Sequence, residues 1–170
     1  MSRSRPSSKQ PFRRPVCVAG WRSVSVSVVS YDLLLVSCAY EKLDRAAEAR
    51  DLYISERFRL ARRYAEQRSQ PWFILSGEHA LVRPVDWLAP YDTSLDDMPP
   101  EYQSAWGAWV VAKLSRLYGN LHGSQVEIHA PQSYVEPIAP SLKAAGSALQ
   151  LPLADVAWSE WATWYRQNEG

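Results

Sequence analysis

The chain consists of short apolar runs separated by longer amphipathic stretches. Two runs, residues 33–36 (LLLV) and 72–75 (WFIL, followed by Ser76), are continuously apolar. Such runs are typical of strands that are buried on both faces of a parallel sheet. Weaker runs at residues 126–130 and 148–151 predict two further strands. Strands that alternate with helical stretches indicate parallel β-α-β units.

Four stretches between and after these runs have helical features, and they cover residues 55–67, 99–118, 133–145 and 159–167. Pro99 and Pro100 suit the first turn of the second helix, and Gly119 suits its C-terminal cap. Pro137 and Pro140 are expected to shorten or kink the third helix. The predicted fold is a single three-layer α/β domain of Rossmann-like type, with a small, mostly parallel sheet of about four strands flanked by helices.

Length and composition fit one globular domain with a basic extension. The chain has 170 residues, of which 46% are hydrophobic and 22% charged, and its formal net charge is +1. This balance predicts no strong overall attraction to nucleic acid or membranes. Residues 1–25 are expected to form a disordered tail, with a non-specific phosphate-binding arm as the alternative, and residues 26–170 the α/β domain. The basic residues that precede the first acidic residue, Asp32, are Arg3, Arg5, Lys9, Arg13, Arg14 and Arg22.

Several classes of protein lose support because their signatures are missing from the sequence. Cys17 and Cys38 have neither metal-ligand spacing nor the pattern of a disulfide framework, and a reduced, buried Cys38 suits the cytoplasm. No signal peptide or membrane span is evident. The chain has no P-loop, G-x-G-x-x-G, H-E-x-x-H or G-x-S-x-G motif. We therefore predict a cytoplasmic protein without a cofactor or a metal site.

In open parallel sheets, ligands bind at the loops that follow the carboxyl ends of the strands. The loop after the first strand contains Ser37 and Lys42, and Arg50, Asp51 and Tyr53 follow shortly. Lysine and arginine could bind a phosphate there, while Asp51 orients them or acts as a base. The alternative is a solvated loop in which Asp51 or Ser55 caps the next helix.

The loop after the second strand supplies a second group of candidates. It contains Ser76, Gly77 and His79, and it continues to Tyr91 and Asp92. Gly77 permits a tight turn or the close approach of another backbone segment. His79 is a candidate acid or base, although a structural histidine is the simpler interpretation. His129, at the end of the third strand, could face the same crevice. Asp96 and Asp97 fit a favourable interaction with a helix dipole better than a metal site.

Four ordered sequence blocks resemble a family of uncharacterised bacterial and phage proteins. The blocks are LVSC-x-x-x-KLD, ARDLY-x-S-x-x-F, WFILS-x-x-H-x-L and PYD-x-x-L, and they lie between residues 33 and 95. The family's corresponding segments are LVSCGKxKL, ARDLYxSxxF, LSAKHGLL and PYDxTL. The matching positions are Ser37, Cys38, Lys42, Leu43, Arg50, Asp51, Leu52, Tyr53, Ser55, Phe58, Ser76, His79, Pro90, Tyr91 and Asp92.

The resemblance implies a distant likeness to uracil-DNA glycosylases, and therefore action on a nucleobase or its N-glycosidic bond. Tyr40 and Glu78 stand where the family has lysines, and Ala80 replaces a glycine. These changes weaken any anion site that depends on the lysines. The leading hypothesis is a glycosylase-like hydrolase with nucleic acid or a nucleotide as its partner. The alternatives are a non-catalytic binding module for the same ligands and a protein-interaction domain, and the oligomeric state is open.

In the leading hypothesis, a crevice at one rim of the sheet brings together residues from distant parts of the chain. The expected catalytic residues are His79, Asp51 and Asp92, and the expected substrate-binding residues are Ser37, Lys42, Arg50, Tyr53, Ser76 and Tyr91.

Overall fold

The computed structural model describes residues 31–169, and within them the predicted α/β fold is confirmed. The predicted tail and Cys17 lie outside these residues. The elements are β1 (Leu33–Ser37), β2 (Ala47–Glu48), α1 (Ala49–Leu52), α2 (Glu56–Glu66), β3 (Trp72–Ser76), β4 (Ala80–Val82), β5 (Trp87–Leu88), the 3-10 turn η1 (Leu95–Asp97), α3 (Pro100–Tyr118), β6 (Gln125–His129), α4 (Gln132–Ala144), β7 (Ala148–Gln150), the 3-10 turn η2 (Trp158–Glu160) and α5 (Trp161–Gln167).

The main sheet has five strands in the order β4-β3-β1-β6-β7. β1 lies at the centre and pairs in parallel with β3 and β6, so that Leu35 is opposite Phe73 on one side and Ile128 on the other. β7 extends the parallel part beyond β6, and β4 runs antiparallel at the opposite edge. The sheet is therefore mostly parallel, as the apolar runs predict.

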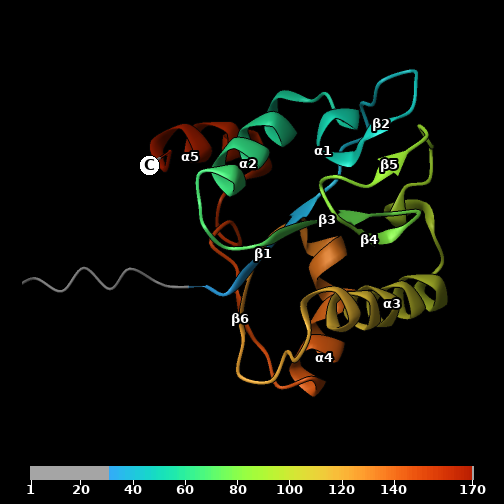
Figure 1. Ribbon diagram of the computed structural model, residues 1–170, viewed down its shortest axis with the longest axis vertical. Coiled ribbons are helices and arrows are strands. Elements are labelled where there is room, and N and C mark those ends of the chain that lie inside the picture. Colours follow the sequence, from blue (N-terminus) through green and yellow to red (C-terminus); the bar gives the residue numbers. More distant parts are fainter. Residues whose placement is uncertain (1–30, 170) are drawn as a thin grey trace, which may run out of the picture.

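Helices cover both faces of the sheet and make three layers (Figure 1). Successive residues of a strand point to opposite faces. Leu33 and Leu35 pack with the residues of α3 and α4, while Leu34 and Val36 pack with those of α2 and α5. This double burial explains why β1 is an unbroken apolar run.

Local capping chemistry sets the ends of the helices. The Ser55 side chain accepts a hydrogen bond from the Phe58 amide and caps α2, the structural role expected for it. Pro100 is the first residue of α3, and Gly119 ends that helix with a φ of 112°. Only a glycine adopts this conformation without strain, so the predicted C-terminal cap is confirmed.

The two prolines of α4 do not end it, because the helix runs from Gln132 to Ala144 with Pro137 and Pro140 inside. The expected shortening is therefore wrong. α3 packs directly on this segment, and a Cβ atom at Gly107 would lie 2.0 Å from the Pro137 carbonyl oxygen. The missing side chain at Gly107 allows the two backbones to approach closely.

Three strands fall outside the sequence prediction. β4 lies within the segment expected to be a loop, and β2 pairs with β5 in a separate antiparallel sheet. The turn into β4 places Ala80 at a φ of 60°, the left-handed region that favours glycine. Because alanine rarely marks such a turn, the sequence gives no local signal for it.

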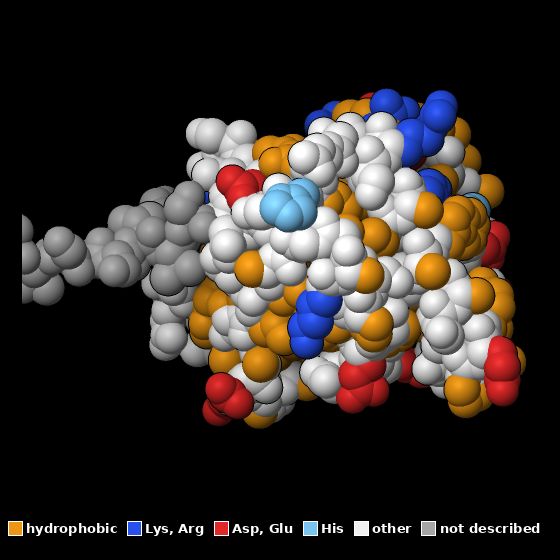
Figure 2. Space-filling view, turned by 90° about the horizontal axis from the view of Figure 1, so that it is seen from below, with side chains coloured by type: hydrophobic (Ala, Val, Ile, Leu, Met, Phe, Trp, Pro, Cys, Tyr) orange, Lys and Arg blue, Asp and Glu red, His pale blue; other side chains and the backbone are white. Residues whose placement is uncertain are grey.

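The surface carries charges of both signs. Viewed from below, acidic and basic side chains are dispersed among apolar and uncharged atoms (Figure 2). Within residues 31–169, no helix combines the length and the apolar character needed to cross a membrane.

Candidate functional site

The order of the strands creates a crevice at the centre of the sheet. From β1 the chain crosses through α2 to β3, whereas it reaches β6 through α3 on the opposite face. The loops that follow β1 and β6 therefore diverge to different faces. Such a switch point leaves an opening at the carboxyl ends of the two strands, where open α/β sheets bind ligands.

A cleft of about 360 Å³ occupies this position. Its walls come from the loop after β1, the start of α2, the segment around η1, the end of β6 and the C-terminal η2 and α5. The lining residues are Val36, Ser37, Cys38, Ala39, Tyr40, Glu41, Lys42, Ser55, Arg57, Phe58, Ala61, Thr93, Ser94, Asp96, His129, Pro131, Tyr134, Trp158, Trp161 and Tyr165.

Two cations in the cleft lack a carboxylate partner. Among residues 31–169, the ion pairs within 4.0 Å include neither Lys42 nor Arg57. Lys42 Nζ donates to the Tyr40 carbonyl and lies 4.4 Å from the centre of the Tyr91 ring. Partial burial lowers the pKa of Arg57, against the effects of Tyr165 and Glu41. A bound anion would compensate for this loss of solvation.

Aromatic rings line the same cleft. The Arg57 guanidinium lies 3.5 Å from the centre of the Trp158 ring, whose own side chain is 46% exposed. Tyr40 is 81% exposed at the cleft, and Tyr134 is buried against it. Burial raises the pKa of Tyr134, and the nearby Cys38 and Asp96 add to this shift, so its hydroxyl stays protonated. Planar surfaces beside cations suit an aromatic ligand with an anionic group.

Four of the predicted site residues form one cluster next to the cleft. Tyr91 Oη lies 2.8 Å from both Tyr53 Oη and Ser76 Oγ, and Ser76 Oγ accepts a hydrogen bond from the His79 amide. The His79 ring packs edge-on against Tyr91, with the two centroids 5.2 Å apart. Lys42 and His79 thus contact the same tyrosine, but only Lys42 lines the cleft.

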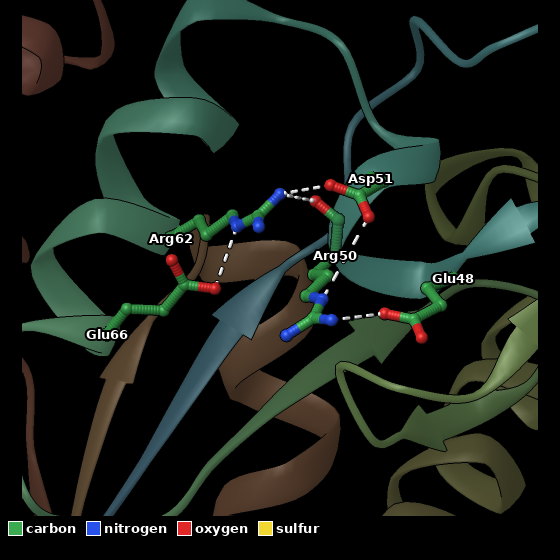
Figure 3. A network of polar contacts seen from close by, with 5 residues as sticks. All are labelled: Glu48, Arg50, Asp51, Arg62 and Glu66. Carbon is green, nitrogen blue, oxygen red and sulfur yellow. Dashed lines mark hydrogen bonds and ion pairs between the residues drawn. The ribbon is translucent and has the colours of Figure 1, made fainter.

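Arg50 and Asp51 belong to a different group of charges (Figure 3). Asp51 forms an ion pair with Arg62, and Arg50 pairs with Glu48 at 2.6 Å. Arg62 also pairs with Glu66 along α2. None of these residues lines the cleft. The structure therefore does not bring Asp51 into one crevice with Lys42 and His79, and it gives Asp51 a partner that supports the loop before α2.

The carboxylates at the cleft differ from those expected. Asp92 is exposed and is not a lining residue, whereas Glu41 and Asp96 are. Gly77 explains the position of this segment, since a Cβ atom there would lie 2.9 Å from the Thr93 carbonyl oxygen. The predicted close backbone approach at Gly77 is confirmed, and it holds residues 93–96 against the cleft.

The sequence analysis names His129 as a residue that could face the crevice, but it misses the buried Glu127 that pairs with it beneath the cleft. Glu127 and His129 point to the α2 and α5 face of β6, and Glu127 Oε1 lies 2.8 Å from His129 Nε2. His129 is fully buried and lies on the cleft wall with Tyr165. The alternation Val-Glu-Ile-His, in a strand expected to be buried on both faces, was the available signal. Nothing in the sequence distinguishes Arg57 from its neighbouring arginines.

Two further expectations from the sequence concern Ser37 and Cys38. Ser37 ends β1 and lines the cleft, and its substrate-binding role stays a prediction. Cys38 is a free thiol, but it is only half-buried, because β1 ends one residue earlier and the chain turns towards the cleft. Its sulfur lies 3.6 Å from Tyr134 Oη.

The fold and the cleft together define a three-layer α/β protein with a cleft at the switch point of its sheet. The chain belongs to the family of unknown function DUF6884, which matches residues 33–167. No curated protein and no solved structure matches the chain significantly. The family match extends from β1 to α5 and so covers every element that builds the cleft.

Proposed function

We propose that this protein is an enzyme that binds a nucleotide, or a base within nucleic acid, and hydrolyses its N-glycosidic bond. The observation that carries the proposal is the combination, in one cleft, of two unpaired cations and exposed aromatic rings. Its position at the switch point of the sheet supports a ligand site independently. The cytoplasmic location expected from the sequence is part of the proposal.

Lys42 and Arg57 would bind the phosphate of the ligand. Both line the cleft, and among the described residues neither forms an ion pair with a carboxylate within 4.0 Å. Ser55 and Arg57 also place the first turn of α2 at the cleft, where free backbone N–H groups and the helix dipole favour an anion. Three independent sources of positive potential therefore act on one small volume.

Tyr40 would stack on the base, and Trp158, whose ring is packed against Arg57 and Trp161, would border it. Both side chains are exposed at the cleft, and base–aromatic stacking tolerates any base because each has a π face. The likeness to uracil-DNA glycosylases implied by the sequence adds a base in DNA to the candidate substrates. A base in a duplex would have to be flipped out of the helix to enter the cleft.

Hydrolysis would pass through a sugar centre with oxocarbenium character. Water adds to C1′ while the C1′–N bond breaks, the electron pair stays on the leaving base, and the water proton finally reaches that base. A carboxylate beside C1′ stabilises the developing positive charge. Asp96 and Glu41 replace Asp51 and Asp92 in this role, since they line the cleft. His79 remains a candidate for orienting the Lys42–Tyr91 side of the site.

A non-catalytic binding module is the second candidate. The same cations and rings would serve such a module. The absence of two lysines expected from the family resemblance also favours a module without catalytic activity. The protein-interaction alternative has less support, because Trp161 is buried and the exposed Trp158 stacks with Arg57 and Trp161.

The test is a search for released bases. The full chain is incubated with nucleosides, nucleoside 5′-monophosphates, DNA and RNA that carry normal or modified bases, and free bases are measured by mass spectrometry. We expect release from at least one substrate, and we expect Asp96→Asn to abolish turnover while binding persists. Saturable binding without release in any reaction would favour the binding module, and neither binding nor release would contradict both.

Arg57→Met and Arg59→Met form a matched pair for the phosphate site. Both residues lie on α2, but Arg59 is exposed outside the cleft. We expect Arg57→Met to weaken binding of the identified nucleotide by on the order of tenfold or more, since a charge-assisted hydrogen bond contributes about 1.5–3 kcal/mol. Calorimetric titration should show the parental affinity for Arg59→Met. Equal losses in the two variants would contradict the assignment.

A further inference from the structure

A line of buried hydrogen bonds leads from the interior of the molecule to the cleft. Tyr64 Oη donates to Glu127 Oε1 at 2.9 Å, and the same oxygen lies 2.8 Å from His129 Nε2. His129 Nδ1 lies 2.9 Å from Tyr165 Oη. All four side chains are buried, and only His129 and Tyr165 line the cleft. The line therefore ends at Tyr165, a residue of the cleft wall.

The chemistry of these groups fixes the direction of each hydrogen bond. As a carboxylate, Glu127 only accepts, so His129 Nε2 donates to it. A neutral imidazole then has an unprotonated Nδ1, which accepts from the Tyr165 hydroxyl. Burial lowers the pKa of His129, although Glu127 acts in the opposite direction, so the ring is neutral at neutral pH. Tyr165 thus points its proton at a base that a carboxylate orients.

Other charged and titratable groups near His129 come from α2, from the residues just after α2, and from α5. Tyr64 and Arg68 face it from the α2 side, and Tyr165 from α5, where Trp164 also packs edge-on against the ring. Arg68 lowers the pKa of His129 further, and its guanidinium lies over the Tyr64 ring. Glu127 is therefore the group that favours the protonated form of His129.

We propose that Tyr165 is a catalytic residue that deprotonates the attacking water, and that His129 and Glu127 position and polarise its hydroxyl. The arrangement has the logic of a carboxylate–histidine–hydroxyl triad. This inference rests on the proposed function, because it names the group that activates water for the same hydrolysis.

The proton transfers balance without a further reactant. One proton passes from water to Tyr165 Oη as the Tyr165 proton passes to His129 Nδ1, and the hydroxide forms the bond to C1′ as the C1′–N bond breaks. The resulting imidazolium is paired with the Glu127 carboxylate. The proton then returns through Tyr165 to the departing base, which restores all three side chains.

Two tyrosine variants separate catalysis from structure. Tyr165→Phe and Tyr64→Phe each remove one buried hydroxyl from the same network, but Tyr64 does not line the cleft. On the substrate identified by base release, we expect Tyr165→Phe to lower kcat on the order of 10²–10⁴-fold with little change in KM. Tyr64→Phe should lower kcat far less, because Tyr64 acts on the line only through Glu127. Equal effects of the two changes, or an unchanged kcat in Tyr165→Phe, would overturn the proposal.

Glu127→Gln tests the charge separately from the hydrogen bond. The substitution keeps an acceptor oxygen for His129 but removes the charge that stabilises the imidazolium. We expect kcat to fall and the pH at which the rate is half-maximal to change, whereas KM should stay near its parental value. A variant with the parental kcat and pH profile would show that Glu127 has no part in the proton transfer.

A measurement without substrate examines the geometry itself. Nitrogen-15 NMR of the labelled full chain reports which ring nitrogen of His129 carries the proton. We expect a neutral ring protonated at Nε2, and a proton on Nδ1 or on both nitrogens at neutral pH would overturn the relay. If no substrate releases a base, the proposed function fails and Tyr165 has no catalytic role in it. The tautomer then still shows whether the hydrogen-bonded relay exists.

Discussion

At the scale of single residues, a few buried side chains are held by hydrogen bonds to other buried polar groups. His129 is the clearest case, because it has no exposed surface and both of its ring nitrogens are hydrogen bonded. Burial disfavours the charged form of this imidazole, and so lowers the pKa of His129. The stability of the fold should therefore depend on pH through this one side chain.

The sign of this dependence follows from the lowered pKa of His129, which is caused first by burial. Between the folded value and the ordinary value of 6.5, the unfolded chain binds more protons than the folded one. The stability that comes from keeping His129 neutral is fully present above pH 6.5. As the pH falls below this value, the free energy of unfolding should decrease by at most about 1.4 kcal/mol per pH unit. Urea unfolding at several pH values measures the slope.

His122 provides the control for that series because it is exposed. His129→Gln should lose this part of the pH dependence, since glutamine does not titrate, whereas His122→Gln should keep it. The same slope in His129→Gln and the parent protein would assign the dependence to other groups.

The hydroxyl cluster around Tyr91 gives a second prediction for a single residue. Tyr91→Phe removes a hydroxyl that serves both Tyr53 and Ser76, and the buried Tyr53 hydroxyl loses its partner. We expect a loss of about 1–3 kcal/mol in the free energy of unfolding, measured by urea denaturation. Tyr102→Phe, at an exposed position, should change it little. A Tyr91→Phe protein with the parental free energy of unfolding would show that these hydroxyl hydrogen bonds do not stabilise the fold.

Helices α3 and α4 illustrate how packing between elements depends on one small residue. The Pro137 backbone occupies the space that a side chain at Gly107 would need, and a backbone atom cannot move aside as the end of a flexible side chain can. α4 continues through both of its prolines, and its backbone at Pro137 lies against α3.

Gly107→Ala should therefore separate the two helices. We expect the free energy of unfolding to fall by about 1–3 kcal/mol, despite the higher helix propensity of alanine. Ala108→Ser, at an exposed position in the same turn, should stay within about 0.5 kcal/mol of the parent. A Gly107→Ala protein with the parental urea midpoint would show that the helices adjust freely.

The elements were largely predictable from the sequence, and the exceptions have physical causes. β1 and β3 are buried on both faces, which makes their apolar runs unambiguous. β4 has only three residues, and its turn uses Ala80 where a glycine would have marked it. α4 runs through Pro137 and Pro140 without ending, and its close packing on α3 at Gly107 is a tertiary contact that no local pattern reports.

For the molecule as a whole, the order of the strands determines where a ligand can bind. β1 lies between two parallel neighbours, and the chain leaves β1 for α2 on one face and leaves β6 for α4 on the other, so the opening falls between the ends of β1 and β6. The loop after β1 was predictable as part of the site from this rule alone, and Ser37 and Lys42 lie there.

The remaining site residues depend on distances that the sequence does not contain. Asp51 and Lys42 are close in sequence, yet Arg62 on α2 pairs with Asp51 in a network outside the cleft lining. Arg57 and Tyr165 come from different helices and meet at the cleft only after both helices have packed on the same face. Residue type predicted the kind of chemistry, but only the packing shows which residues share a site.

Mapping a bound nucleotide onto the labelled full chain decides whether this cleft is the binding site. The four common ribonucleoside 5′-monophosphates are titrated in turn, and amide shifts are followed by NMR. At least one should produce saturable shifts concentrated in residues 37–42, 55–58, 93–96 and 129–134, and Lys42→Met should weaken them. Saturable shifts centred on the Arg50–Asp51 network, or no saturable shift with any of the four, would contradict a nucleotide site between β1 and β6.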